Sequence, residues 1–146
     1  MNISIAELEN ILRSEVANSS SIIDCKNSIS IDGISIDSRT INKNELFIAI
    51  KGDSHDGHLF INDAIKNGAS LIISEHRVEG FPYISVDDTT DSLAEIAKFY
   101  VDKIRPIVIG VTGTNGKTSV TNMTSMILQT YKKTLSTYKN YNNQIG

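Results

Sequence analysis

The residues best suited to chemistry in this sequence lie in a glycine-rich stretch, "VTGTNGKTS", which follows a run of aliphatic residues. Lys117 and two hydroxyl residues come directly after Gly116. Glycines let backbone N–H groups approach a phosphate closely, and the lysine supplies a positive charge for it. The common P-loop pattern, G-x-x-x-x-G-K-[ST], does not fit, because its first position is occupied by Val111. The glycines fall instead at positions 110, 113 and 116.

A helix that begins near Gly116 would leave its first backbone N–H groups without partners, and such groups bind anions together with the helix dipole. The sequence therefore predicts a nucleotide-phosphate site in this loop. Lys117 is expected to contact the terminal phosphates, and the hydroxyl of Thr118 is suited to binding Mg²⁺. The alternative is a glycine-rich turn that only joins a strand to a helix. The residues assigned to the phosphate site are Gly113, Thr114, Asn115, Gly116, Lys117, Thr118 and Ser119.

The elements that would position this loop alternate between helical and strand-like patterns. Ser4 and Glu7 have the spacing of a capping box at the start of a helical apolar stripe. Alternating isoleucines predict strand structure over 29–36, and their slip at Gly33 indicates two short strands or one bulged strand. Further strands are predicted at 45–50, 70–74 and 83–86, with a helix that ends at Gly68 and another capped by Thr90 or Asp91.

From residue 105 the pattern restarts, with a predicted strand at 107–111, the glycine loop, a helix over 117–131 and a strand at 133–137. Strands that alternate with helices of this length predict a parallel α/β fold. We place a domain boundary near 104–106, which gives domains at 1–104 and 105–146. The second domain is too short to close a parallel sheet, so the chain is expected to be the front portion of a longer protein.

Charged residues are distributed unevenly along the chain. Residues 1–97 carry a net charge of −9, whereas residues 98–146 carry +6. Basic surroundings of a glycine-rich loop suit an anionic ligand. Nucleic-acid binding is not expected, because the basic residues are not interleaved with aromatic residues and match no known module.

Cysteine content and hydropathy predict the compartment. Cys25 is the only cysteine, so no internal disulfide is possible and a reducing compartment is expected. The start of the chain lacks the basic flank and apolar run of a signal peptide. No apolar run approaches the roughly 20 residues needed to span a bilayer. These features predict a cytoplasmic protein without membrane insertion.

Two stretches carry a resemblance to a known family. The stretch "GVTGTNGKTS" resembles the ATP loop of the Mur ligases, in which the glycines have the spacing found here. The stretch "IDSRTINKNELFIAIKGDSHDGHLFINDAIKNGASLIIS" resembles the amino-terminal domain of the Mur ligases that extend the muramyl peptide. The resemblance implies a small amino-terminal α/β domain that holds the UDP part of a substrate, followed by the first β-loop-α-β unit of a P-loop ATPase domain.

The same resemblance implies an ATP-dependent ligase of peptidoglycan-precursor synthesis, with ATP and Mg²⁺ as cofactors. ATP would phosphorylate the carboxylate of UDP-N-acetylmuramoyl-tripeptide, and the amine of D-alanyl-D-alanine would attack the acyl phosphate. The closing stretch "STYKNYNNQIG" favours this reaction, whereas "KFY" at 98–100 favours the alternative, addition of the third residue to UDP-N-acetylmuramoyl-dipeptide. An unrelated P-loop kinase would explain the glycine loop but not the first stretch. The chain alone is expected to be a monomer that binds substrate without catalysis.

The residues that the resemblance places in the sites fall in three groups. Lys117 and Thr118 would carry the catalytic role at the phosphates. Ser38 and the loop Asp53, Ser54 and His55 would face uracil and ribose, with Arg39, Asp56 and His58 shaping the same pocket. Asn142 or Asn143 would lie near the phosphates or the metal. Structural alternatives remain for two of these residues: a hydrogen-bonded scaffold for His58 and an ion pair for Arg39.

Overall fold

The computed structural model of this protein describes residues 3–17, 30–52 and 55–137. The chain divides into two compact units, unit 1 (Met1–Ile104) and unit 2 (Arg105–Gly146). Among the described residues, none of the helices combines the length and the apolarity needed to cross a membrane.

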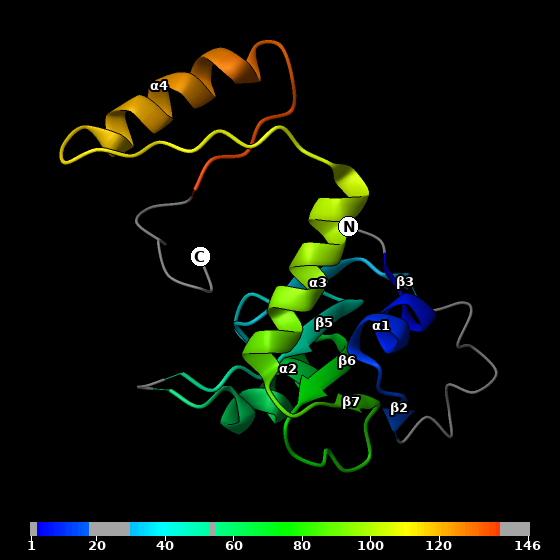
Figure 1. Ribbon diagram of the computed structural model, residues 1–146. Coiled ribbons are helices and arrows are strands. Elements are labelled where there is room, and N and C mark those ends of the chain that lie inside the picture. The colour runs from blue at the N-terminus through cyan, green and yellow to red at the C-terminus, as the bar shows by residue number, and fades with distance from the viewer. Residues whose placement is uncertain (1–2, 18–29, 53–54, 138–146) are drawn as a thin grey trace. The chain divides into compact units, whose positions relative to one another are not determined.

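Unit 1 is built around a five-stranded sheet in the order β2-β7-β6-β5-β4 (Figure 1). The four strands from β4 to β7 run parallel, and β2 pairs antiparallel with β7 at the edge. A separate antiparallel pair joins β1 (Ile3–Ser4) to β3 (Ser30–Ile31). The predicted α/β fold is confirmed, and the antiparallel edge strand β2 makes the otherwise parallel sheet mixed. The sheet strands are β2 (Val16–Ala17), β4 (Gly33–Ser35), β5 (Glu45–Ile48), β6 (Ala69–Ser74) and β7 (Tyr83–Ser85).

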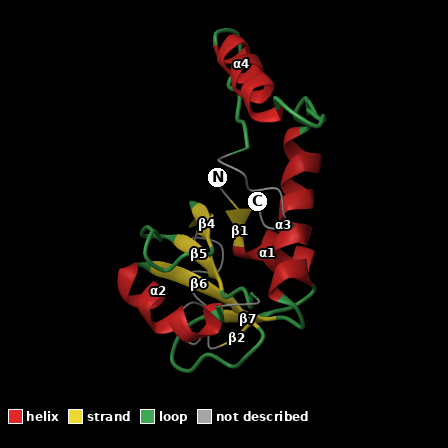
Figure 2. Ribbon diagram, turned by 90° about the vertical axis from the view of Figure 1, so that its left-hand side faces the viewer, coloured by secondary structure: helices red, strands yellow, loops and turns green. Residues whose placement is uncertain are grey.

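Helices cover both faces of this sheet (Figure 2). On one face lie α1 (Ile5–Leu12) and α3 (Thr89–Ile104), and on the other lie the 3₁₀ helix η3 (Gly57–Phe60) and α2 (Ile61–Asn67). Successive residues of β5 explain this arrangement: Leu46 and Ile48 belong to the apolar cluster of α1 and α3, whereas Phe47 belongs to that of α2. A parallel strand covered on both faces is apolar at consecutive positions, as here.

The helix termini follow from local hydrogen bonds, with one correction. The capping box of α1 is confirmed, since the Ser4 hydroxyl accepts from the Glu7 N–H at 3.2 Å and the Glu7 carboxylate accepts from the Ser4 N–H at 2.9 Å. The predicted caps of α3, Thr90 and Asp91, are wrong. Their backbone N–H groups donate to the Asp88 carboxylate at 2.7 and 2.9 Å, so Asp88 caps the helix. A capping side chain must precede the N–H groups that it accepts from, and Thr90 and Asp91 lie too far along the chain to do so.

The strand interruption predicted at Gly33 and the helix end predicted at Gly68 are both confirmed. The isoleucine-rich stretch forms two short strands around Gly33, β3 and β4, and these belong to different sheets. Gly68 ends α2 with a left-handed backbone, at φ 116°. A left-handed residue in this position satisfies the last carbonyl groups of a helix and favours glycine.

Unit 2 contains helix α4 (Lys117–Gln129) and no strand among its described residues, 105–137. The strands predicted at 107–111 and 133–137 are therefore wrong for this structure. A strand needs a neighbouring strand to pair its N–H and C=O groups, and neither segment has one. The side chains of Ile107 and Leu135 are accordingly exposed, at 82% and 89%. Of the predicted β-loop-α-β unit, the loop and the helix are present.

Replacing Gly57 by alanine should destabilise unit 1. A Cβ at this position would lie 2.6 Å from the carbonyl oxygen and 2.8 Å from the nitrogen of Ile50, and backbone atoms cannot give way as a side chain does. Overpacking of this kind costs about 1–3 kcal/mol. Thermal unfolding should show a lowered Tm for Gly57→Ala and an unchanged Tm for Gly110→Ala, whose Cβ would meet nothing within 4 Å. Equal Tm values for the two variants would contradict this packing.

Candidate functional site

A pocket of about 800 Å³ opens on unit 1 between the segment that follows β4, the segment that follows β5, and helices η3 and α2. Three residues that the sequence assigns to substrate binding, Ser38, Arg39 and His55, line it together. Apolar walls with a few polar groups suit a ligand that has a flat ring and hydrogen-bonding edges. The other lining residues are Ile36, Asp37, Phe47, Ile50, Gly57, Phe60, Asp63, Lys66 and Asn67.

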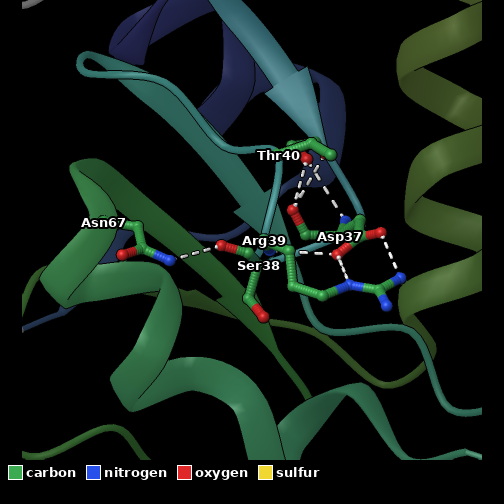
Figure 3. A network of polar contacts seen from close by, with 6 residues as sticks. Asp37, Ser38, Arg39, Thr40 and Asn67 are labelled. Atoms are coloured by element: carbon green, nitrogen blue, oxygen red, sulfur yellow. Dashed lines mark hydrogen bonds and ion pairs between the residues drawn. The ribbon is translucent and has the colours of Figure 1, made fainter.

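An ion pair closes the turn that follows β4 (Figure 3). Arg39 donates from Nε to Oδ1 of Asp37 at 2.9 Å and from Nη2 to Oδ2 at 2.7 Å, and its backbone N–H also reaches Oδ1. The side-chain hydrogen bonds of Arg39, followed by its backbone N–H, lower the pKa of Asp37 to about 2. The same contact raises the pKa of Arg39. Arg39 therefore forms the ion pair of the structural alternative, but it does so on the wall of the pocket.

Ser38 lies inside this turn with its carbonyl and its hydroxyl pointing in different directions (Figure 3). The carbonyl accepts a hydrogen bond of 2.8 Å from the side-chain amide of Asn67, at the end of α2. Ser38 is only 7% exposed, and no hydrogen bond in the described part of the chain engages its hydroxyl. The hydroxyl is not among the buried side-chain atoms that lack a partner, so it keeps access to the pocket, where a polar group of a ligand can pair with it.

The "HDGH" segment forms a hydrogen-bonded scaffold. The ring of His58 joins Nδ1 to Oδ1 of Asp56 at 2.7 Å, while its Nε2 accepts from the backbone N–H of Glu75 at 3.2 Å. Because Nε2 is an acceptor, the ring proton is on Nδ1. The backbone N–H of His58 is the main cause, and its ring the second cause, of a lowered pKa for Asp56. These contacts agree with the scaffold alternative for His58.

The scaffold continues to the start of α3. The carboxylate of Glu75 accepts from the backbone N–H of Thr89 at 3.1 Å and from its hydroxyl at 3.0 Å. The chain after β6 is therefore fixed on one side by the ring of His58 and on the other by the first turn of α3. This network holds the loop at the pocket in place, and direct ligand contact by Asp56 and His58 stays a prediction.

In unit 2, the glycine loop presents the start of α4 without a side-chain cap. Gly116 has a left-handed backbone with φ 77°, and Gly113 also has positive φ, at 155°. The N–H of Val120 makes the first hydrogen bond of the helix, to the carbonyl of Gly116 at 2.9 Å. The N–H groups of residues 117–119 precede that bond and have no acceptor among the described residues. This is the arrangement that binds phosphate at a helix N-terminus.

Two side chains complete the candidate phosphate site. The ammonium group of Lys117 donates to the carbonyl of Gly113 at 2.6 Å, so it lies over the loop that it would serve. Thr118 is exposed next to it in the first turn of α4. A free hydroxyl beside unpaired N–H groups and an ammonium group fits a triphosphate with a bound Mg²⁺.

The structure leaves some predicted site residues undetermined and adds others. Asp53, Ser54, Asn142 and Asn143 lie outside the described residues. Phe60 and Asn67 are among the pocket residues that the sequence did not predict. Phe60 closely follows "DGH", and Asn67 directly precedes the glycine that ends α2, so both stand beside recognised signals.

Comparisons with known proteins agree with this fold. A family model described as "Mur ligase family, catalytic domain" matches residues 30–101. The chain is 43% identical over 122 residues to the UDP-N-acetylmuramoyl-tripeptide–D-alanyl-D-alanine ligase of Buchnera aphidicola subsp. Baizongia pistaciae, covering 82% of this chain and 26% of the relative. It is 46% identical over 113 residues to the UDP-N-acetylmuramoyl-L-alanyl-D-glutamate–2,6-diaminopimelate ligase of Clostridioides difficile, covering 73% and 23%.

Solved structures show the same similarity. The UDP-N-acetylmuramoylalanyl-D-glutamyl-2,6-diaminopimelate–D-alanyl-D-alanyl ligase of Acinetobacter baumannii matches with a TM-score of 0.83 and 26% identity, over 99% of this chain and 32% of that one. The MurF ligase of Thermotoga maritima, solved in complex with ADP, matches with a TM-score of 0.66 and 31% identity, over 77% of this chain and 26% of that one.

The fold is thus a mixed α/β domain of the kind found at the amino terminus of peptidoglycan-precursor ligases. The chain carries a Mur ligase family domain, as its resemblance to that family predicts. It spans about a quarter of the length of the curated relatives that it matches.

Replacing Arg39 by glutamine should raise the pKa of Asp37. That pKa lies at about 2 in the folded chain, below its ordinary value of 3.8. The stabilisation from the pair is therefore complete above the ordinary value and is lost as the pH falls towards 2. In Arg39→Gln, carbon-detected NMR should show the Asp37 carboxyl signal titrating between about pH 5 and about pH 3. In the parent chain the same signal should stay constant over this range. Arg77→Gln, an exposed arginine outside the pocket, is the matched control. Identical Asp37 titrations in the two variants would exclude Arg39 as the cause.

Proposed function

We propose that this chain supplies the UDP-substrate site and the ATP loop of a ligase that joins D-alanyl-D-alanine to UDP-N-acetylmuramoyl-tripeptide. The observation that carries this proposal is the presence, in one chain, of two candidate ligand sites that follow the two motifs of the family. One is the pocket of Ser38, Arg39 and His55 in unit 1, and the other is the uncapped start of α4 in unit 2. The names of the relatives from Buchnera and Acinetobacter support the choice of reaction.

Each site has a distinct task in this proposal. In unit 1, the Ser38 hydroxyl and the Arg39 guanidinium would bind the polar groups of the uridine diphosphate, with Phe60 on the apolar wall. In unit 2, the N–H groups at the start of α4 and the ammonium of Lys117 would hold the triphosphate, and Thr118 would hold Mg²⁺. ATP supplies the phosphoryl group that activates the substrate carboxylate. The contribution of the loop is to fix the phosphates and to neutralise the charge that spreads over them.

A second candidate is the ligase that adds the third peptide residue to UDP-N-acetylmuramoyl-dipeptide. It is favoured by the relative from Clostridioides difficile, which is named for that reaction and is 46% identical over its shorter match. Both candidates use a UDP-linked substrate and ATP, so they differ in the peptide and in the amine. The whole protein would distinguish them by the amine that triggers phosphate release, D-alanyl-D-alanine for the first and an amino acid for the second.

Calorimetry with UDP-N-acetylmuramoyl-tripeptide tests the site in unit 1. We expect the chain to bind this compound and to bind UDP itself, because the pocket lies in unit 1 alone. An unrelated kinase that shares only the glycine loop would release no heat with either compound. Absence of binding for both compounds would therefore remove the ligase proposal.

The Lys117→Ala variant tests whether the two ligands occupy separate sites. Loss of the ammonium group should weaken binding of a non-hydrolysable ATP analogue at least about tenfold, the effect of losing a charge-assisted hydrogen bond. Affinity for UDP-N-acetylmuramoyl-tripeptide should stay within about twofold, since no lining residue of the unit 1 pocket belongs to the loop. Lys133→Ala, an exposed lysine beyond α4, is the control and should change neither. Equal losses for both ligands in Lys117→Ala would contradict the two-site arrangement.

A further inference from the structure

The side-chain amide of Asn67 joins α2 to the turn that carries Ser38, across 29 positions of the chain. Its Nδ2 donates to the Ser38 carbonyl at 2.8 Å, as Figure 3 shows. The partner is a carbonyl oxygen, which only accepts, so the amide must present its NH₂ group here. Asn67 is the last residue of α2 and is followed by the left-handed Gly68, which fixes the direction in which the helix ends.

The opposite side of the same turn is held by bonds within the turn itself. The carbonyl of Asp37 accepts from the N–H of Thr40 at 3.2 Å and from the hydroxyl of Ser35 at 3.0 Å. Asn67 of α2, by contrast, lies outside this turn and is hydrogen-bonded to it through its side chain. The orientation of the Ser38 peptide unit consequently depends on the end of α2.

We propose that Asn67 is a positioning residue of the pocket: it holds the Ser38 carbonyl so that the Ser38 hydroxyl faces the bound uridine nucleotide. This inference rests on the proposed function of unit 1. Ser38 is 7% exposed and its hydroxyl has no hydrogen-bond partner among the described residues, so a small rotation of its peptide unit moves that hydroxyl relative to the ligand. Asn67 lines the same pocket, and the effect passes through Ser38.

A double-mutant cycle on this chain, with UDP as the probe, separates positioning from a general loss of stability. The variants are Asn67→Ala, Ser38→Ala and the double variant, each titrated calorimetrically below its own unfolding transition. Asn62→Ala is the matched control, because it makes the same change on the exposed side of α2 outside the pocket. The positions of the Arg39 and Thr40 amide signals in the ligand-free chain provide a second readout that does not depend on binding.

With Ser38 present, Asn67→Ala should weaken UDP binding about fivefold, the effect of one lost hydrogen bond. With Ser38→Ala, the same change should have less than about a twofold effect, because residues that act as a unit are not additive. The amide signals of Arg39 and Thr40 should shift in Asn67→Ala and stay in place in Asn62→Ala.

Two other results would overturn the inference in distinguishable ways. If the parent chain binds UDP but Asn67→Ala has no effect, or has the same effect with and without Ser38, the positioning role is wrong and the proposed function stands. Unmoved amide signals at Arg39 and Thr40 would have the same meaning. If the parent chain does not bind UDP at all, the proposed function of unit 1 fails and the positioning role fails with it.

Discussion

The parallel pairing of β4 to β7 is the constraint on which the pocket of unit 1 depends. Parallel strands end at the same edge of a sheet, so the segments that leave β4 and β5 begin next to each other there. The β4–β5 connection must then return along the sheet, and Ile41 anchors it in the same apolar cluster as Ala64 of α2. That return path brings Ser38 within hydrogen-bond distance of Asn67. The pocket is therefore a product of topology rather than of one local motif.

Some polar groups around this pocket are held in hydrogen bonds that are costly to break, whereas others can turn to a ligand at little cost. An exposed ion pair such as Asp37–Arg39 adds little stability because water screens it, so the guanidinium can turn to another anion at little cost. The ring of His58 is 6% exposed with both nitrogens hydrogen-bonded, and breaking such a buried arrangement costs about 1–3 kcal/mol per unsatisfied group. Arg39 and the Ser38 hydroxyl are thus available to a ligand, whereas a ligand contact by a ring nitrogen of His58 would have to replace an existing hydrogen bond.

Local signals in the sequence were sufficient where the structure is also local. The capping box at Ser4, the left-handed end of α2 at Gly68 and the apolar strand around Phe47 depend on a few neighbouring residues, and all were predicted. The strand at 107–111 was not correct, because aliphatic composition shows a tendency to form a strand but not the presence of a pairing partner. Asn67 was missed for a related reason: its hydrogen bond to Ser38 exists only after the sheet has folded.

The two candidate sites differ in how far their donors depend on the rest of the molecule. In unit 2, the donors come from the first turn of α4, whose N-cap is Gly116. The first hydrogen bond of this helix is made by Val120, although no sheet is formed among residues 105–137. A nine-residue stretch is therefore enough to predict that geometry. In unit 1, the groups come from separate segments that only the packed sheet brings together. No short pattern can encode such a pocket, which is why its prediction required a resemblance extending over dozens of residues, whereas the glycine loop could be interpreted from its own residues.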